Sequence, residues 1–220
     1  MGTTFTAWQV SGLNNDFRIC TTYPQLLVVP FATTDKMMEE VAVFRSRGRI
    51  PVLSYIHSPN GASITRSSQP RVGLTSRCEA DELLLQYIIQ AQPLVRPDGV
   101  PVFGSASGSA SAPTVRLAVL DCRPRLNAMA NKAGGKGFES MCNYKHCSLT
   151  FQNIENIHYV RDAFKAFKAI IHRAGAGQDD DKWLSKLQDS KWLEYIHDIL
   201  NAAFHMAGLV DQGINVLCHC

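Results

Sequence analysis

The sequence predicts an α/β fold in which helices flank a central, largely parallel sheet. Short apolar runs bounded by turn residues alternate with longer segments in which apolar residues recur at helical spacing, and this alternation is typical of α/β proteins. The chain has 220 residues, 45% of them hydrophobic, so it can bury one sizeable core. No long linker divides the sequence, and we therefore expect a single domain over residues 1–220.

The first strand and the first helix are predicted near the N-terminus. Residues 26–29 ("LLVV"), followed by Pro30, are typical of a short buried strand. In "TTDKMMEEVAVF", Thr34 or Asp35 can cap a helix, which Gly48 would end. The apolar face of this helix is predicted to contain Met37, Met38, Val41 and Phe44.

A hairpin, a second helix and an insertion follow. "IPVLSYI" and "ASITRSS" flank "HSPNG", where Asn60 and Gly61 favour a tight turn between two strands. Ser76 and Glu79 have the spacing of a capping box before the helical run "ELLLQYII". At about 95–114 the composition shifts to Pro, Gly, Ser and Ala, which predicts a flexible surface insertion within the domain.

Strands and helices continue to alternate in the second half of the chain. "VRLAVLD" is predicted to be a buried strand that ends at Asp121, and a short helix follows near 124–132. "SLTFQNI" and the closing "INVLC" are predicted strands, and "NIHYVRDAFKAFKAII" is a predicted helix. The segment from "WLSKLQDSK" to "HMAGLV" is predicted to be helical, with a break near Ser190. The buried faces of these helices are predicted to contain Val160, Phe164, Phe167 and Ile171, then Trp192, Ile196, Ile199 and Leu200.

Composition excludes several classes of protein. The net charge of +3 is too small to indicate a nucleic-acid-binding protein, and no apolar run reaches the roughly 18 residues of a membrane span. Seven cysteines, an odd number, and a first segment unlike a secretory signal argue against a disulfide framework. We therefore expect a reducing, cytosolic setting, where a cysteine with a functional role would act through the reactivity of its thiol.

The last six residues, "NVLCHC", place His219 and Cys220 directly after an apolar strand. In thiol phosphatases a loop begins at such a point with the nucleophilic cysteine, and its backbone N–H groups bind phosphate and favour the thiolate. The alternative is a buried strand that contains ordinary apolar cysteines, and these six residues alone favour that alternative.

Longer motifs elsewhere in the chain favour the thiol-phosphatase interpretation over the ordinary buried strand. "FRSRGRIPVLSYIH", "RSSQP", "LDCRPRLNAMANKAGGKGFES" and "IENIHYVRDAF" resemble the myotubularin family of phosphoinositide 3-phosphatases, from about Trp8 to Cys220. The resemblance implies a cysteine-phosphatase-like α/β domain that needs no metal and no other cofactor. It implies removal of the 3-phosphate from phosphatidylinositol 3-phosphate and phosphatidylinositol 3,5-bisphosphate through a cysteinyl-phosphate intermediate. The "HC" pair is typical of the active members, whereas "DKWLSKLQDSKWLEYIHDIL" also resembles their inactive partners, so the subgroup stays open.

The resemblance also implies site residues. Cys220 is the expected nucleophile, and His219 is expected to bias the neighbouring thiol and to orient the loop. Asn131 and Asn156, with Ile157, match the family's contacts to the lipid headgroup, and carboxamides can hydrogen-bond inositol hydroxyls and phosphate oxygens. The alternative is structural: Asn131 would cap the end of one helix and Asn156 the start of the next.

In the family's loop, usually "HCSDGWDR", two functional residues follow the cysteine. One is an arginine that clamps the phosphoryl group, and the other is an aspartate that transfers protons. Both positions lie beyond Cys220. We therefore expect residues 1–220 to be a fragment or splice form: the N-terminal part of a phosphatase domain, incomplete at its C-terminus and inactive alone. A terminal carboxylate beside the thiol would also raise the thiol pKa.

Partners follow from the same resemblance: phosphoinositide lipids, peripheral contact with endosomal membranes from the cytoplasm, and pairing with itself or with relatives. A second hypothesis is a non-catalytic module that pairs with full-length relatives. A third is a zinc protein that uses Cys142, His146 and Cys147 with residues 218–220, but these spacings do not match a standard pair of zinc knuckles.

The "FRSRGR" motif contains three alternating arginines. Arginine suits anionic headgroups because its planar fork binds phosphate oxygens in pairs. At least two of Arg45, Arg47 and Arg49 are expected to be solvated surface charges, and no site is assigned to them.

Overall fold

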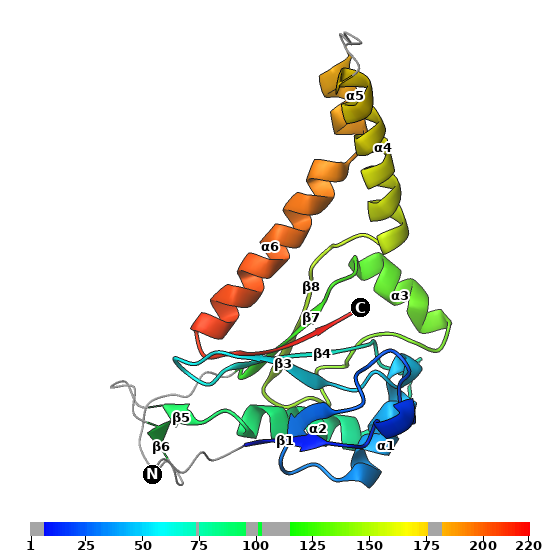
Figure 1. Cartoon of the computed structure of the whole chain (residues 1–220). Coiled ribbons are helices and arrows are strands. Elements are labelled where there is room, and N and C mark those ends of the chain that lie inside the picture. The colour runs from blue at the N-terminus through cyan, green and yellow to red at the C-terminus, as the bar shows by residue number, and fades with distance from the viewer. Residues whose placement is uncertain (1–6, 74, 96–100, 103–114, 176–181) are drawn as a thin grey trace.

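A five-stranded sheet forms the centre of the fold (Figure 1). The computed structural model describes residues 7–73, 75–95, 101–102, 115–175 and 182–220. In the sheet the strands have the order β3 (Val52–Ile56), β4 (Ser63–Ser67), β9 (Asn215–His219), β7 (Leu117–Asp121) and β8 (Cys147–Phe151). The β3–β4 pairing is antiparallel and the other three pairings are parallel, which confirms the predicted largely parallel sheet.

The last strand of the chain lies in the middle of the sheet. β9 pairs with β4 on one side and with β7 on the other, although both strands come much earlier in the sequence. Side chains of successive strand residues point to opposite faces of a sheet, so a central strand needs apolar residues at every position. Val216 and Leu217 are fully buried, as are Leu117 and Val119 of β7.

Helices cover both faces of the sheet. On one side lie α1 (Asp35–Phe44), α2 (Glu79–Gln90) and the small antiparallel sheet of β1 (Trp8–Ser11) and β2 (Leu27–Pro30) (Figure 1). Their apolar side chains form one buried cluster with Leu117, Val119 and Leu217. On the other side, the C-terminal end of α6 (Trp192–Asp211) packs on the sheet through a smaller cluster.

Helix α1 is confirmed, with an earlier end than expected. The Thr34 hydroxyl accepts a hydrogen bond from the backbone N–H of Met37, so Thr34 is the N-cap. The helix ends at Phe44 rather than at Gly48, because Arg45 adopts an extended conformation and forms a β-bridge with Pro70. Gly48, with φ of +65°, ends a separate short 3-10 turn, η2 (Ser46–Gly48). Met38, Val41 and Phe44 are buried as predicted.

The predicted hairpin is confirmed, and the predicted capping box is wrong. Gly61 has φ of +72°, and Asn60 Nδ2 donates to the carbonyl of Val210, which ties the turn to the end of α6. Ser76 lies two residues before Cys78, the N-cap of α2, and Cys78 makes no side-chain cap. The first turn of α2 is instead tied to the preceding loop, where Arg77 donates two hydrogen bonds to the carboxylate of Glu82.

Most of the predicted insertion at about 95–114 lies outside the described residues. Of that range, residues 95 and 101–102 are described, and they belong to two short antiparallel strands, β5 (Leu94–Val95) and β6 (Pro101–Val102).

The second half contains every predicted helix. α3 (Arg125–Ala133) matches the expected short helix, and α4 (Ile157–Gly175) follows β8. α5 (Trp183–Asp189) ends where a break was predicted, since Lys191 has φ of +57° and α6 begins at Trp192. No helix in the described part of the chain is long and apolar enough to cross a membrane.

The predicted buried faces of α4 and α6 are partly wrong. Phe164, Ile171, Ile199 and Leu200 are between 39% and 55% exposed, whereas Ala163 and Ala202 are buried. The reason is that α4 and α6 extend away from the sheet and meet near α5 (Figure 1). There the ring of Trp192 packs against Phe164 and Phe167, and only a narrow stripe of each helix is covered.

Candidate active site

The carboxyl ends of four neighbouring parallel strands meet at one edge of the sheet. Register pairs Ser67 of β4 with His219 of β9, and Asp121 of β7 with both His219 and Phe151 of β8. Ligands of open α/β sheets bind at such an edge, where the chain leaves neighbouring strands toward different elements. Cys220 follows the central strand, so it lies in the middle of this edge.

A cavity of about 560 Å³ opens beside Cys220. Its wall includes Arg123 after β7, Asn131 of α3, and Asn156 and Ile157 at the start of α4. The structure therefore brings together four of the five predicted site residues, although they are up to 89 positions apart in sequence. A cavity of this size can hold a small polar ligand such as a sugar-phosphate headgroup.

His219 is the predicted site residue that does not line this cavity; its side chain is buried on the other side of β9. The alternation of a strand explains this, because neighbouring residues point in opposite directions. Any effect of His219 on Cys220 would therefore pass through the backbone or through space rather than through shared contact with a ligand.

Asn131 lies on the cavity side of α3. Asn127, Ala130 and Asn131 all line the cavity, as expected for positions three and four apart on a helix. The backbone carbonyl of Asn131 accepts hydrogen bonds from the N–H groups of Gly134 and Lys136, so the turn after α3 is closed by the backbone. The Asn131 side chain is therefore not the cap that the structural alternative required.

Asn156 does have the structural role that the alternative predicted. Its Oδ1 atom accepts a hydrogen bond of 2.9 Å from the N–H of His158, which caps α4. The cap uses only the oxygen of the carboxamide, so Nδ2 can still donate to a ligand. Ile157, the first residue of α4, is 70% exposed beside it.

The environment of the Cys220 thiol does not favour the thiolate. Burial raises the pKa of Cys220; Arg123 opposes this effect, and Asp121 and Cys218 add to it. Arg123 uses four of its five N–H groups on protein acceptors: it binds both carboxylate oxygens of Asp121, at 2.9 and 2.6 Å, the carbonyl of Gly137 and the side chain of Gln69. Its charge is thus compensated by Asp121 before any phosphate arrives.

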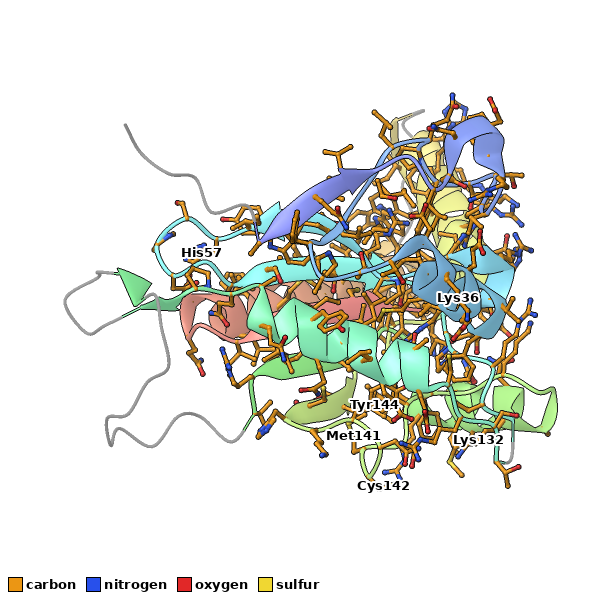
Figure 2. All side chains as sticks on the ribbon, turned by 90° about the horizontal axis from the view of Figure 1, so that it is seen from below. Lys36, His57, Lys132, Met141, Cys142 and Tyr144 are labelled. Atoms are coloured by element: carbon orange, nitrogen blue, oxygen red, sulfur yellow. The ribbon has the colours of Figure 1, made fainter. Side chains whose placement is uncertain are left out.

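A buried network of charged groups fixes His219. His219 Nε2 lies 2.9 Å from one oxygen of Glu139, and the other oxygen of Glu139 accepts a hydrogen bond of 2.6 Å from Arg45. Arg45 also donates two bonds of 2.7 Å to Asp81, which accepts a further bond from the hydroxyl of Tyr144. The network joins the end of α1, helix α2, the segment before β8 and strand β9. Figure 2 shows Tyr144 near α2 and Cys142 farther from this helix.

The charges of this network determine the hydrogen-bond pattern of the histidine. Burial opposes ionisation of Glu139, but His219 and Arg45 outweigh it and hold the pKa of Glu139 well below its ordinary value. Because an ionised carboxylate only accepts hydrogen bonds, His219 Nε2 must carry the hydrogen. His219 Nδ1 is buried and has no hydrogen-bond partner among the described residues.

Sequence reasoning did not find Arg45, Asp81, Glu139 and Arg123. Of the three arginines of "FRSRGR", Arg47 is exposed and Arg49 is partly exposed, with Nε bonded to Thr22, whereas Arg45 is completely buried. One weak signal for Arg45 is its place four residues after Val41, in line with the apolar face of α1. The described residues contain no group of three or more His, Cys, Asp or Glu side chains able to hold a metal ion.

The chain is similar in sequence to known phosphatases. A family model described as "Myotubularin-like phosphatase domain" matches residues 1–220. The chain is 38% identical to a phosphatidylinositol-3,5-bisphosphate 3-phosphatase of Gallus gallus, over 97% of this chain and 31% of that protein. It is 36% identical to myotubularin of Xenopus tropicalis and 39% identical to a phosphatidylinositol-3-phosphate phosphatase of Homo sapiens, over 97% of this chain and 32% and 29% of those proteins. The chain thus spans about a third of the length of these relatives.

Proposed function

Because the chain belongs to the family of myotubularin-like phosphatase domains, we propose that it forms part of a phosphatase that removes the 3-phosphate from phosphatidylinositol 3-phosphate and phosphatidylinositol 3,5-bisphosphate. The observation that carries this proposal is the cavity at the sheet edge, whose wall includes Cys220, Asn131 and Asn156. We treat residues 1–220 as one part of a single phosphatase domain, with an insertion at about 95–114.

The proposed roles follow from the chemistry of each group. The Cys220 sulfur attacks the phosphorus of the 3-phosphate and displaces the inositol oxygen, and water then hydrolyses the cysteinyl-phosphate. The carboxamides of Asn131 and Asn156 hold the inositol hydroxyls and phosphate oxygens, and Ile157 packs against the headgroup. His219, held by Glu139, fixes the end of β9 from which the nucleophile projects.

A polypeptide of these 220 residues is expected to release phosphate at background rates. The thiol pKa is raised, and Arg123 is already paired with Asp121, so no described group near Cys220 supplies a free positive charge to the transferring phosphoryl group. The test compares phosphate release from phosphatidylinositol 3-phosphate by this polypeptide and by the same residues joined to the continuation of the Gallus gallus relative. The joined protein should be active and Cys220→Ser should abolish its activity; activity of the serine variant would contradict the role of Cys220.

Two substitutions at Asn156 separate headgroup binding from helix capping. Asn156→Ser keeps an N-cap oxygen and removes the carboxamide donor, whereas Asn156→Asp keeps the oxygen and adds a charge that repels phosphate. In the joined protein, both should lower kcat/KM by about tenfold or more, the aspartate more strongly, with little change in thermal stability. Asn201→Ala on α6, outside the cavity wall, is the matched control. Unchanged kcat/KM in both variants would leave Asn156 with the capping role alone.

Membrane contact belongs to the same proposal. The protein would act from the cytoplasm as a peripheral protein at endosomal membranes, where its lipid substrates are presented. Sedimentation of the polypeptide with vesicles that contain phosphatidylinositol 3-phosphate, compared with vesicles of phosphatidylcholine alone, measures this contact. Equal sedimentation with both would mean that residues 1–220 do not recognise the headgroup by themselves.

A non-catalytic module that pairs with itself or with relatives is the second candidate. The observation that favours it is the exposure of large apolar side chains along the helices beyond the sheet: Phe164, Leu184, Leu193, Leu200 and Phe204 are between 46% and 80% exposed. Such surfaces commonly mark an interface. Analytical ultracentrifugation of the chain alone and mixed with the Gallus gallus relative distinguishes the candidates. A module of this kind sediments as a dimer or co-sediments with the relative, and a fragment without this role does neither.

A further inference from the structure

Two cysteines outside the proposed catalytic roles lie in contact at the ends of the central strands. The sulfur atoms of Cys122, which follows β7, and Cys218, in β9, are 3.4 Å apart. Register pairs Leu120 with Cys218, and Cys122 comes two residues after Leu120, so both side chains project from the face of the sheet that α6 covers.

The backbone around this pair is fixed on both sides. The N–H of Cys122 donates to the carbonyl of His219, and the carbonyl of Cys122 accepts from the N–H of Ile154. These bonds hold Cys122 against β9 although β7 ends at Asp121. The sheet therefore holds the backbones of the two cysteines close enough for their sulfur atoms to come into contact.

Small oxidants can reach the pair. An apolar cavity of about 580 Å³ between the sheet and α6 has Cys122 in its wall, with Ile64, Ile199 and Met206. Cys122 and Cys218 are both partly exposed. Cys20, by contrast, is buried in the main core, and Cys142 is exposed with no second thiol beside it.

The two thiols differ in acidity. The hydrogen bond with Cys122 lowers the pKa of Cys218; burial opposes this effect, and the charges of His219 and Arg66 support it. The same hydrogen bond and burial raise the pKa of Cys122. One sulfur is thus the better thiolate nucleophile and its neighbour stays a thiol, a division that suits stepwise oxidation of a dithiol.

We propose that Cys122 and Cys218 form a site of reversible oxidation, at which hydrogen peroxide converts the dithiol into a disulfide. The Cys218 thiolate attacks one peroxide oxygen and breaks the O–O bond, which gives a sulfenic acid and, after proton uptake, water. The Cys122 sulfur then attacks the Cys218 sulfur and displaces a second water, with loss of the Cys122 proton. Two thiols lose two electrons, one hydrogen peroxide is reduced to two waters, and an external dithiol reverses the reaction.

The disulfide would link the ends of β7 and β9 beside the candidate active site. Cys122 directly precedes Arg123, which lines the cavity of Cys220, and Cys218 directly precedes His219. Closure requires the sulfur atoms to approach from 3.4 Å to about 2.05 Å. The proposal goes beyond the phosphatase function and does not depend on it.

The test uses the full 220-residue chain in reduced form, treated with hydrogen peroxide, alkylated, digested with trypsin and analysed by mass spectrometry. In a sample taken before alkylation and digestion, we expect a loss of about 2 Da in intact mass, as two thiols become one disulfide. A cross-link should join residues 117–125 to residues 192–220, and dithiothreitol should remove it. This measurement on the unsubstituted chain is independent of whether any variant folds.

Three variants assign the partners, because residues 192–220 contain both Cys218 and Cys220. Cys220→Ser should keep the cross-link, Cys218→Ser should abolish it, and Cys142→Ser should leave it unchanged as the control thiol. A cross-link that survives in Cys218→Ser and is lost in Cys220→Ser would overturn the proposal in favour of Cys220. Oxidation of the unsubstituted chain to sulfinic acids without any cross-link would also overturn it.

Discussion

The guanidinium of Arg45 joins distant parts of the fold through two buried carboxylates, Asp81 and Glu139. Burial lowers the pKa of Arg45, but the two carboxylates outweigh burial and raise it overall. Arg45 is thus charged at any pH at which the protein folds, and it orients Glu139, which in turn orients His219 at the candidate site.

Replacement of Arg45 tests the network at the residue scale. Arg45→Met should lower the free energy of unfolding by about 3–5 kcal/mol, because it leaves buried carboxylates without their cation. The matched control is Arg47→Met, two positions away and exposed, which should change the free energy of unfolding by no more than about 0.5 kcal/mol. Urea denaturation of both variants measures the difference. Equal effects would show that the buried ion pairs contribute no more than surface charges.

The depressed pKa of Glu139 predicts a dependence of stability on pH. In the acid range the unfolded chain binds a proton at this residue, with a pKa of about 4.3, and the folded protein does not. The contribution of Glu139 is therefore fully present above that pH and is lost as pH falls below it. Below about pH 4, Glu139→Gln should reduce the slope of unfolding free energy against pH by up to about 1.4 kcal/mol per pH unit. Identical acid slopes for the two proteins would contradict this assignment.

At the scale of elements, the turn between β3 and β4 is held from outside the hairpin. Gly61 has φ of +72°, and an added Cβ would lie 2.5 Å from the Cδ atom of Pro93. Asn60 reaches the last turn of α6 through two backbone carbonyls, Val210 and Asp211. The turn therefore fixes the position of β4, the neighbour of β9, relative to α6, which packs on one face of the sheet.

Two glycine substitutions with opposite expected signs test this turn. Gly61→Ala should destabilise the protein by about 1–2 kcal/mol or more, through the left-handed backbone and the contact with Pro93. Gly208→Ala, within α6 and with open space around the new Cβ, should stabilise by roughly 0.5–1 kcal/mol. Thermal denaturation gives both values. A stabilised Gly61→Ala variant would mean that the turn is not constrained by Pro93.

At the scale of the whole molecule, the sheet is well covered on the α1–α2 side and sparsely covered on the α6 side (Figure 1). The main cluster gathers side chains from both helices, β2 and the sheet, whereas the second cluster depends on the last turns of α6. The apolar surface of α4 and α6 beyond the sheet is therefore open to association with other molecules.

Charged substitutions on α6 separate packing from association. Phe204 is 80% exposed, so Phe204→Glu should change the free energy of unfolding by no more than about 0.5 kcal/mol while weakening self-association in sedimentation. Val210 is 3% exposed, so Val210→Glu should prevent stable folding through burial of an unpaired charge. Large destabilisation by Phe204→Glu would show that this face is packed within one chain.

Local signals in the sequence predicted most elements of the fold. Asn60–Gly61 identified the hairpin, Thr34 the start of α1, and the run up to Asp121 the strand β7, because turn geometry, capping and continuous burial each depend on residues close in sequence. The face predictions for α4 and α6 failed where these helices leave the sheet, since helical spacing shows which side is apolar and not whether anything covers it.

By itself the sequence determined the α/β class, the order of most elements and the motifs that identify the family, since these depend on local patterns and on residue identity. The short strands β1, β5 and β6 were not predicted. The family motifs had already predicted Asn131 and Asn156 as site residues with Cys220, and the structure gives the cavity that they share. The tertiary structure alone decided that β9 lies at the centre of the sheet and that His219 contacts Glu139, which Arg45 holds. The physical reason is that parallel pairing joins segments up to about 150 residues apart, and such contacts leave no periodic signal in the chain.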